Sequence, residues 1–148
     1  TGVQTCALPI SLGTLIEYVA GEQKIKVAGV DTFQGTAGEG LEYPADMQAK
    51  CELNLVRCRF AAAPVIFPYQ SIDAARGFED GGIDYVFLDA AHDYESVRAD
   101  IAAWSPKIAP GGILAGHDYT FSADVKRAVD EAFGDRVEVI GECWLVQF

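Results

Sequence analysis

The stretch that decides the fold is IDYVFLDAAHDYESVRADIAAWSPKIAPGGILAGHDY, residues 83–119. Residues 85–88 form a short apolar run of β-forming side chains, which suits a strand buried on both faces. A helical pattern follows and ends at Pro106 and the turn at residues 110–112, and residues 113–115 read as a second buried strand. This order predicts a β-α-β unit with parallel strands and a right-handed crossover. The apolar face of its helix is expected to carry Tyr94, Val97, Ile101 and Trp104 as core residues, with Arg98 and Asp100 between them.

Polar side chains follow each of the two strands at the point where the strand ends. Asp89 and His92 come after the first strand, and His117 and Asp118 come after the second. The carboxyl ends of parallel strands form the edge at which open α/β sheets bind ligands. Neighbouring strands lie roughly 4.8 Å apart. If these two strands are neighbours, two carboxylates and both histidines of the chain converge on one small volume.

Composition limits the classes of protein to which the chain can belong. Its 148 residues, half of them hydrophobic, suffice for one domain with a core. A net charge of −11 argues against a nucleic-acid partner, which requires basic patches. No apolar run approaches the roughly 18 residues of a membrane span, so no membrane partner is expected. The four cysteines show neither CxxC nor zinc spacing, which favours reduced thiols in a cytoplasmic protein.

The first ten residues, TGVQTCALPI, look foreign to the rest of the chain. They resemble, codon for codon, the translation of a common short-read sequencing adapter. We therefore treat residues 1–10 as an artefact and leave them out of the expected fold, as one would a fusion scar. The alternative is a native loop and strand of unusual composition. On the first interpretation residues 11–148 are a partial domain whose upstream part is missing.

Between residue 11 and the central stretch, the sequence predicts alternating helices and strands. The helix expected after Pro44 carries Met47, Cys51, Leu55 and Cys58 at helical spacing, which we interpret as core packing rather than a thiol site. The other expected elements are a helix over residues 12–20 that ends at Gly21, a strand over 24–30 that ends before Asp31, a mobile loop over 36–43, a strand over 64–67 and a small helix that reaches Phe78.

After the central stretch, the sequence predicts one more helix and a hairpin. Ser122 is a good N-cap, and Gly134 ends the helix. Two strands follow, over residues 136–141 and 143–148, joined by a tight turn at Gly141 and Glu142. The buried face of the helix is expected to hold Val125, Ala128, Val129, Ala132 and Phe133.

The order of the elements predicts a doubly wound, Rossmann-like α/β sheet that closes with an antiparallel hairpin. In this the chain resembles the class I S-adenosylmethionine-dependent methyltransferases, whose seven-stranded sheet ends in such a hairpin. More narrowly, LDAAHDYESVRADIAAW, the PGG turn, AGHDY and the later VKRAVDEAF are similar to the type 24 methyltransferase family, some members of which methylate sugars. The resemblance runs over residues 11–148 and is most specific over residues 83–133. It implies S-adenosylmethionine as cofactor and a small hydroxylated acceptor, such as a sugar, as partner.

The resemblance also assigns roles at the cofactor site. Asp31 matches the acidic residue that accepts hydrogen bonds from the ribose hydroxyls of the cofactor, as a carboxylate is able to do. Its alternative is an acidic turn residue. Ser71, with Gln70 and Ile72, matches the segment that lines the adenine, although Ser71 would serve equally well as a helix N-cap.

At the reaction centre, Asp89 matches the acid beside the methionine part of the cofactor. In related sugar methyltransferases, acids at the positions of Asp89 and Asp118 hold a magnesium ion, and the resemblance implies the same here, with His117 assisting. The position at which relatives often carry a further acid is Ala91 here, which weakens the case for a metal. Without a metal, Asp89 and Asp118 would cap the loop and the turn that follow them.

Methyl transfer is an in-line attack on a sulfonium carbon, so the enzyme must align the nucleophile and remove a proton from it. His92 or His117, with Asp118 beside them, is the expected base, since an imidazole titrates near neutral pH. The alternative for each histidine is a structural role.

One absence limits what the chain is expected to do, and two rival interpretations stay open. The central first strand of these enzymes and the glycine-rich loop that follows it have no counterpart before Ser11, so we expect a gap in the middle of the sheet with unpaired strand edges on both sides. The chain as written is therefore expected to bind the cofactor poorly and to be inactive. The first rival is a nicotinamide-dependent Rossmann oxidoreductase, which the terminal hairpin and the lack of a Tyr-x-x-x-Lys pair disfavour. The second is a non-catalytic binding module with the same fold.

Overall fold

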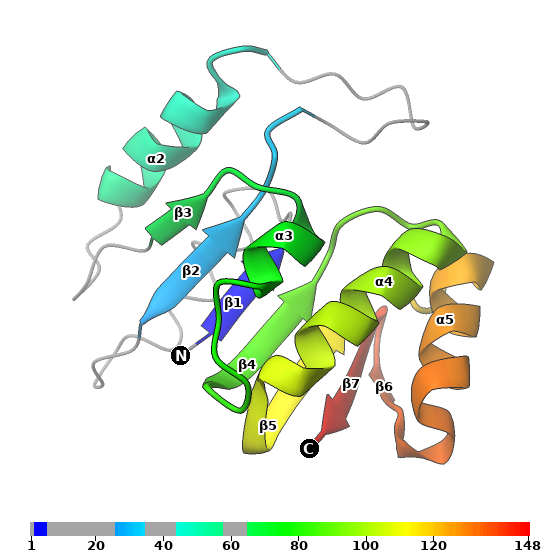
Figure 1. Cartoon of the computed structure of the whole chain (residues 1–148). Helices are drawn as coiled ribbons and strands as arrows, with labels where there is room; N and C mark the ends of the chain where they lie inside the picture. Colours follow the sequence, from blue (N-terminus) through cyan, green and yellow to red (C-terminus); the bar gives the residue numbers. More distant parts are fainter. Residues whose placement is uncertain (1, 6–25, 35–43, 58–64) are drawn as a thin grey trace.

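A seven-stranded sheet organises the protein in the computed structural model, which describes residues 2–5, 26–34, 44–57 and 65–148. The strand order is β3-β2-β1-β4-β5-β7-β6, and all pairs are parallel except those made by β7 (Figure 1). This is a doubly wound order whose direction reverses between β1 and β4, the place at which such sheets bind ligands. The predicted fold class is confirmed.

The central β-α-β unit consists of strand β4 (Ile83–Leu88), helix α4 (Tyr94–Trp104) and strand β5 (Ile108–Gly116), and its two strands are neighbours. One detail differs from expectation. The turn at residues 110–112 does not separate the helix from the strand, because a short 3-10 helix (Ser105–Lys107) ends α4 and β5 begins at Ile108. Residues 110–112 form a bulge inside β5, where the register shifts; proline and glycine are tolerated at such places.

A four-residue strand, β1 (Gly2–Thr5), occupies the centre of the sheet between β2 and β4. Because these residues were left out of the expected fold, a gap was expected in the middle of the sheet. In the structure β1 fills that position. The reason is general. Two facing strand edges present unpaired backbone groups, and an extended segment satisfies them through its main chain whatever its side chains are.

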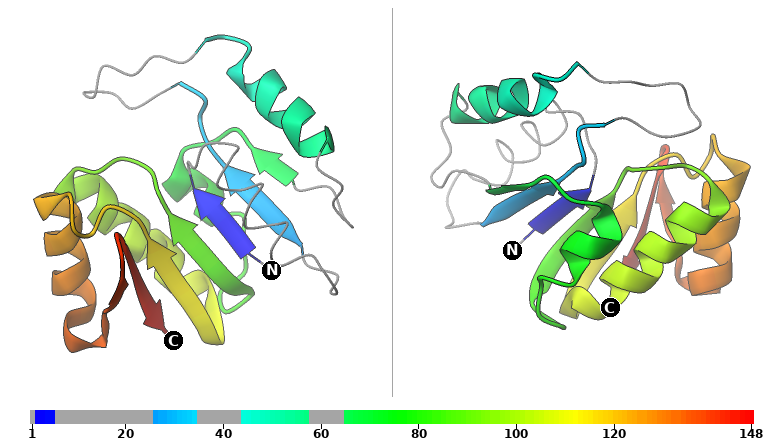
Figure 2. Two further views of the ribbon diagram at one scale, coloured as in Figure 1. Left: turned by 180° about the vertical axis from the view of Figure 1, so that it is seen from behind. Right: turned by 45° about the horizontal axis from the view of Figure 1, so that its top comes forward.

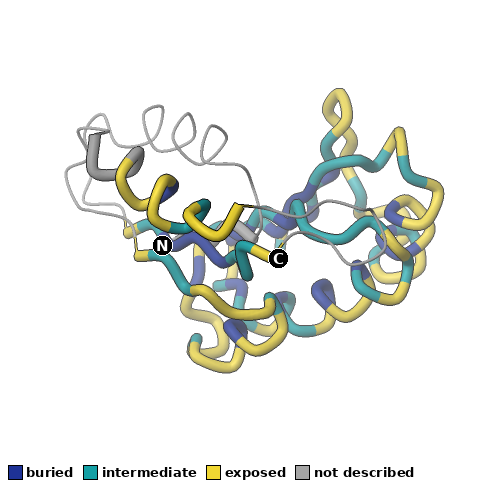
Figure 3. Tube along the Cα trace, turned by 90° about the horizontal axis from the view of Figure 1, so that it is seen from above, coloured by how far each residue is buried: buried dark blue, intermediate teal, exposed yellow. Residues whose placement is uncertain are grey.

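The helices lie on both faces of the sheet. Helices α3 (Ser71–Ala75), α4 and α5 (Ala123–Phe133) cover one face, whereas α2 (Met47–Arg57) lies on the other (Figures 1 and 2). Buried residues gather where the helices meet the sheet, and the outer turns of the helices are exposed (Figure 3). Two tryptophans, Trp104 from α4 and Trp144 from β7 (Cys143–Gln147), are almost completely buried in this core.

The C-terminal part follows the prediction closely. The Ser122 hydroxyl caps α5 by accepting a hydrogen bond from the Val125 N–H, and Gly134 ends the helix with a positive φ of 55°. Strand β6 (Glu138–Ile140) pairs antiparallel with β7 through a two-residue turn at Gly141 and Glu142. Val125, Ala128 and Val129 are buried as expected, but Ala132 is exposed because it lies beyond the edge of the face that contacts the core.

The remaining elements agree with expectation where the structure describes them. Strand β2 (Val27–Val30) begins later than predicted, strand β3 (Val65–Phe67) fills the described part of its predicted range, and Cys51 of α2 is buried in the core. The helix expected over residues 12–20 and the loop over 36–43 lie outside the described residues, as do the side chains of Leu55 and Cys58. Within the described part of the chain, no helix has the length and apolar character to cross a membrane, and Cys51 and Cys143 are free thiols.

Candidate active site

The loop after β4, with sequence DAAHD, begins the site. Asp89 directly follows the strand, and Asp93 closes the loop by capping α4, where its side chain accepts a hydrogen bond from the Ser96 N–H. Burial raises the pKa of Asp89, the charge of His117 lowers it, the charge of Asp118 raises it and the charge of His92 lowers it. The result is a carboxyl that is more easily protonated than usual at the carboxyl end of a central strand.

The turn after β5 supplies the other half of the site. The His117 N–H donates to the Leu88 carbonyl at 3.1 Å, which continues the pairing of β4 with β5 to the edge of the sheet. Asp118 then adopts a positive φ of 59°, a conformation that aspartate tolerates better than most residues. Its carbonyl accepts hydrogen bonds from the N–H groups of Phe121 and Ser122, so the turn that holds Asp118 is well defined.

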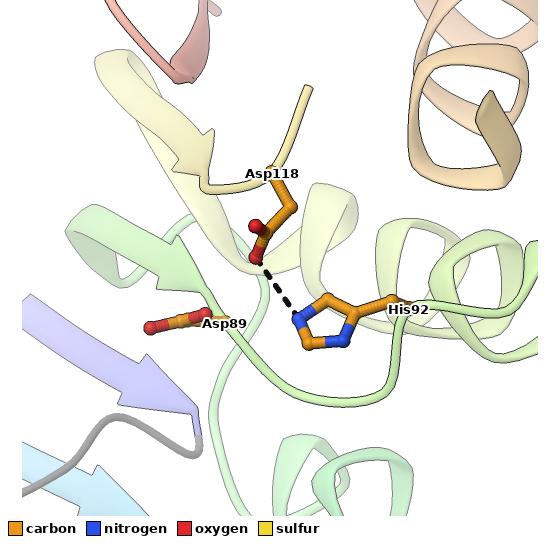
Figure 4. A group of neighbouring side chains, drawn as sticks. All are labelled: Asp89, His92 and Asp118. Carbon is orange, nitrogen blue, oxygen red and sulfur yellow. Dashed lines mark ion pairs between the residues drawn. The ribbon is translucent and has the colours of Figure 1, made fainter. Parts of the chain in front are cut away.

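Asp118 is the point at which the two halves meet. Its Oδ2 atom lies 3.0 Å from His92 Nε2 and 3.1 Å from His117 Nδ1 (Figure 4 shows the contact with His92). The His92 contact is within ion-pair distance, but the buried Nε2 is not directed at the oxygen as a hydrogen bond requires, so we regard it as mainly electrostatic. The predicted convergence of these residues on one volume is present in the structure.

His117 is held from both sides. While Nδ1 faces Asp118, Nε2 lies 3.2 Å from Glu142 Oε2, a residue of the β6–β7 turn. Burial alone would lower the pKa of His117, but the hydrogen bond to Asp118 and the charges of Asp118, Asp89 and Glu142 together raise it. His117 is therefore placed as a donor between two carboxylates.

Three of the residues are spaced to hold a metal ion. Asp89, His92 and Asp118 each offer one ligand atom, and these atoms all lie within 4.8 Å of one another (Figure 4). His117, which was expected to assist, is not in this group among the described residues. A set of two carboxylates and one imidazole fits a divalent ion, although Mg²⁺ itself prefers oxygen ligands.

A pocket of about 290 Å³, including its open mouth, contains the site. Leu88, Val97, Val125 and Trp144 form its apolar wall. Trp144 is able to pack there because Gly116 has no side chain: a Cβ at Gly116 would lie 2.6 Å from Trp144 Nε1. The polar lining of the pocket comprises Asp89, His92, Asp100, His117 and Asp118.

The residues expected to bind the cofactor lie along the same edge of the sheet. Asp31 follows β2, and its carboxylate accepts a hydrogen bond from the Phe33 N–H at 2.7 Å. Ser71 begins α3, but Gln70 is the N-cap residue, so the alternative role of Ser71 as N-cap is wrong. Gln70 and Ile72 are exposed, whereas the Ser71 hydroxyl accepts a hydrogen bond from Trp104 Nε1 at 2.8 Å.

Two polar residues near the site were not singled out from the sequence. Asp100 was expected between the core positions of α4, yet it is only 8% exposed and lines the pocket. Its spacing was the available signal, because Val97, Asp100 and Ile101 are separated by three and four residues. Glu142 gave no such signal, since its contact with His117 depends on how the hairpin folds back onto the sheet.

The sheet order, the terminal hairpin and a polar site at the switch point define the class I methyltransferase fold. Comparison with known structures agrees. The O-methyltransferase NovP matches with a TM-score of 0.73 and 19% sequence identity, and the match covers 98% of this chain and 70% of NovP. CalS11, a TDP-rhamnose 3'-O-methyltransferase of calicheamicin biosynthesis, has a TM-score of 0.63 and 14% identity, with 99% of this chain and 71% of CalS11 covered.

Sequence comparison gives the family. Residues 11–119, well over half of the chain, match a methyltransferase domain of type 24, and the protein belongs to this family. It is also 27% identical over 99 residues to the uncharacterized protein y4gI of Sinorhizobium fredii. That match covers 67% of this chain but only 11% of y4gI, so the chain spans a small part of this much longer relative.

Proposed function

We propose that the protein is an S-adenosylmethionine-dependent O-methyltransferase that acts on a small hydroxylated acceptor such as a sugar. The observation that carries the proposal is the meeting of Asp89, His92 and Asp118 at the carboxyl ends of β4 and β5. Methyl transfer from a sulfonium needs an aligned nucleophile and a group that takes its proton, and this cluster offers both. The likeness to NovP and CalS11 supports the fold on which the proposal rests.

The cofactor would lie along the carboxyl edge of the sheet. Asp31 would accept hydrogen bonds from its ribose hydroxyls, residues 70–72 would line its adenine, and Asp89 would lie beside its methionine part. Because β1 separates β2 from β4, the ends of β2 and β4 are about 10 Å apart, twice the usual spacing between strands. An extended nucleoside with an amino-acid arm spans such a distance.

Within this proposal, His92 is the candidate for the base, because it belongs with Asp89 and Asp118 to the cluster at the strand ends. His117 lies between two carboxylates, at 3.1 and 3.2 Å, which suits a group that positions its neighbours. Asp118 would orient both imidazoles.

A metal ion is a second part of the proposal. Asp89 and Asp118, with His92 as the third ligand atom, would hold a divalent ion such as Mg²⁺. When bound, the ion would orient the acceptor hydroxyl and lower its pKa. A ring nitrogen of His92 that binds the ion is unable to accept a proton as well, so metal dependence decides which role His92 has.

We further propose that residues 1–10 are not native. The resemblance to a sequencing adapter supports this, and so does a family match that begins at residue 11. We call the protein in which residues 1–10 are replaced by the segment that its gene encodes upstream of Ser11 the extended protein.

The test of function uses the extended protein with labelled S-adenosylmethionine and a panel of nucleoside diphosphate sugars and phenolic acceptors. We expect label to enter at least one acceptor. The His92→Ala variant should transfer methyl groups at least about a hundredfold more slowly, the usual contribution of a general base, with the affinity for the cofactor retained. His117→Ala serves as the comparison and should lose less.

The outcomes separate the rivals. Binding of a reduced nicotinamide, seen by its fluorescence, without methyl transfer would favour an oxidoreductase. If the extended protein bound S-adenosylmethionine while both histidine variants matched the wild type in methyl transfer, the site would be a binding module. Assays with EDTA and with added Mg²⁺ or Mn²⁺ test the metal.

A further inference from the structure

Asp100 is a buried carboxyl that the proposed reaction does not use. It is the buried charged residue of the described core, 8% exposed, and it lies on the α4 face that meets the sheet. Burying a carboxyl is costly unless it is hydrogen-bonded, and an apolar residue would pack there at lower cost. The residue therefore calls for an explanation beyond packing.

The partner of Asp100 is the Ser71 hydroxyl, which bridges two elements. Ser71 Oγ accepts from Trp104 Nε1, and tryptophan offers only a donor there. The hydroxyl therefore keeps its own proton to donate, and it lowers the pKa of Asp100, which lies one turn before Trp104 on the buried face of α4. Through these two residues, Ser71 joins the first residue of α3 to the middle and the end of α4.

This link has a ligand pocket on one side and the proposed adenine segment on the other. Asp100 lines the pocket that contains Asp89, His92 and Asp118. Ser71 lies between Gln70 and Ile72, whose exposed side chains are available to a ligand. The Gln70 carbonyl in turn accepts hydrogen bonds from the N–H groups of Asp73 and Ala74, at 3.1 and 2.9 Å, so a fixed Ser71 also fixes the first turn of α3.

We propose that Asp100 is a positioning residue for cofactor binding: through Ser71 it holds residues 70–72 against α4, in the place at which the cofactor meets them. This inference rests on the proposed function, because it assigns residues 70–72 to the adenine. It gives Ser71 an indirect role, since its hydroxyl is engaged within the protein and the ligand meets its neighbours.

The first experiment needs no ligand and uses the 148-residue chain. Amide hydrogen exchange is followed at Asp73 and Ala74, whose bonds to Gln70 report the anchoring of α3. We expect Ser71→Ala and Asp100→Ala each to speed exchange there by about tenfold, and the double variant to add little, since both break the same link. Asp100→Asn retains an oxygen that accepts from Ser71 and should restore wild-type exchange.

Two controls distinguish the link from a general loss of stability. Ser105→Ala is the matched substitution: Ser105 Oγ is buried beside Trp104 and has no hydrogen-bond partner among the described residues, so exchange at Asp73 and Ala74 should not change. The indole N–H resonance of Trp104 should shift in Ser71→Ala while that of Trp144 stays in place. Unchanged exchange in Asp100→Ala together with a lower melting temperature would overturn the proposal, since Asp100 would then serve packing alone.

The second experiment measures S-adenosylmethionine binding by the extended protein. Ser71→Ala and Asp100→Ala should weaken binding about tenfold with little change in kcat, and Asp100→Asn should stay within about twofold of the wild type. If the wild-type extended protein failed to bind, the proposed function would fall. If it bound and all three variants bound equally well, this inference alone would be overturned.

Discussion

Two carboxyls of the pocket, the partly buried Asp89 and the buried Asp100, differ in what surrounds them. Asp89 lies among two imidazoles and Asp118, so charges act on it in both directions. Asp100 is affected chiefly by burial, which raises its pKa to about 6, although the Ser71 hydroxyl lowers it and the charge of Asp93 raises it. Asp89 is thus suited to respond to a bound ion or cofactor, whereas Asp100 is suited to a neutral or weakly charged role inside the protein.

The raised pKa of Asp100 predicts a pH dependence of stability. Because the folded-state pKa of about 6 exceeds the ordinary value of 3.8, folding favours the protonated form. The stabilisation is complete below about pH 4 and is lost as the pH rises through 6. Relative to Asp100→Asn, the wild type should lose on the order of 2–3 kcal/mol over this range. Urea denaturation of both proteins from pH 4 to pH 7 measures the difference.

The comparison with Asp100→Asn is needed because other acids act in the opposite direction. The hydrogen bond from Ser96 holds the pKa of Asp93 below its usual range, and the Lys126 ammonium does the same for Asp130. Their contributions fall as the pH falls and cancel between the two proteins. A constant difference in stability across the range would mean that Asp100 is ionised throughout.

At this scale the sequence predicts some residues and misses others for a physical reason. Asp89, His92, His117 and Asp118 were predicted because each lies in the loop that follows a strand, and strand ends define the edge of a sheet. Asp100 was missed because a charged residue in a helix is normally assigned to the solvent. The hydrogen bond between Ser71 and Trp104 joins residues 33 positions apart in sequence, and the contact of Glu142 with His117 joins residues 25 apart, which local patterns do not report.

At the scale of elements, the site depends on how α5 is attached to the loop after β4. The Ser122 hydroxyl caps α5, and it also donates to the His92 carbonyl at 3.2 Å. One side chain therefore fixes both the start of a helix and the loop that carries His92. The cap was predictable from sequence, but the second bond was not, because it requires the two loops to meet.

Ser122→Ala should destabilise the protein by about 1–2 kcal/mol, the usual cost of losing an N-cap with some added loss from the bond to His92. Chemical denaturation measures the change. Ser122→Asp is the informative comparison, because an ionised aspartate caps well but has no proton to donate to the His92 carbonyl. It should recover most of the stability. Equal losses in both variants would show that the bond to His92, and not the cap, dominates.

Strand β5 must pass close to both β4 and β7 where it reaches the site. At Gly116 an added Cβ would lie 2.7 Å from the Leu88 carbonyl oxygen and 2.6 Å from Trp144 Nε1. A backbone oxygen in a paired strand has little room to move. Gly116→Ala should therefore destabilise the protein by about 2–3 kcal/mol and alter the fluorescence of Trp144.

Gly77→Ala is the matched control for this prediction, because the nearest atom to its added Cβ would be the Ala74 carbonyl oxygen at 3.3 Å. Both effects are read from one urea titration followed by tryptophan emission. A Gly116→Ala variant as stable as Gly77→Ala would mean that Trp144 is free to move away from β5. The side chains of the apolar pocket wall would then be able to rearrange.

At the scale of the whole molecule, pairing and ligand binding make different demands on the middle of the sheet. Strand pairing needs only an extended backbone, which explains how Gly2–Thr5 completes the sheet. The proposed cofactor needs more, because in the proposed binding mode its path from Asp31 to Asp89 would cross the end of β1. Sheets of this type carry glycines there so that the backbone approaches the ligand closely.

The sequence directly after Thr5 is CALPI, which contains no glycine. We therefore expect the 148-residue chain to fold with its sheet complete and yet to bind S-adenosylmethionine weakly or not at all. The extended protein should bind it with micromolar affinity, and Asp31→Ala should weaken that binding. Isothermal titration of the three proteins under one set of conditions provides the measurement. Micromolar binding by the 148-residue chain would contradict the prediction, because it would show that a glycine turn is not needed and that the strands, with Asp31 and Asp89, are enough.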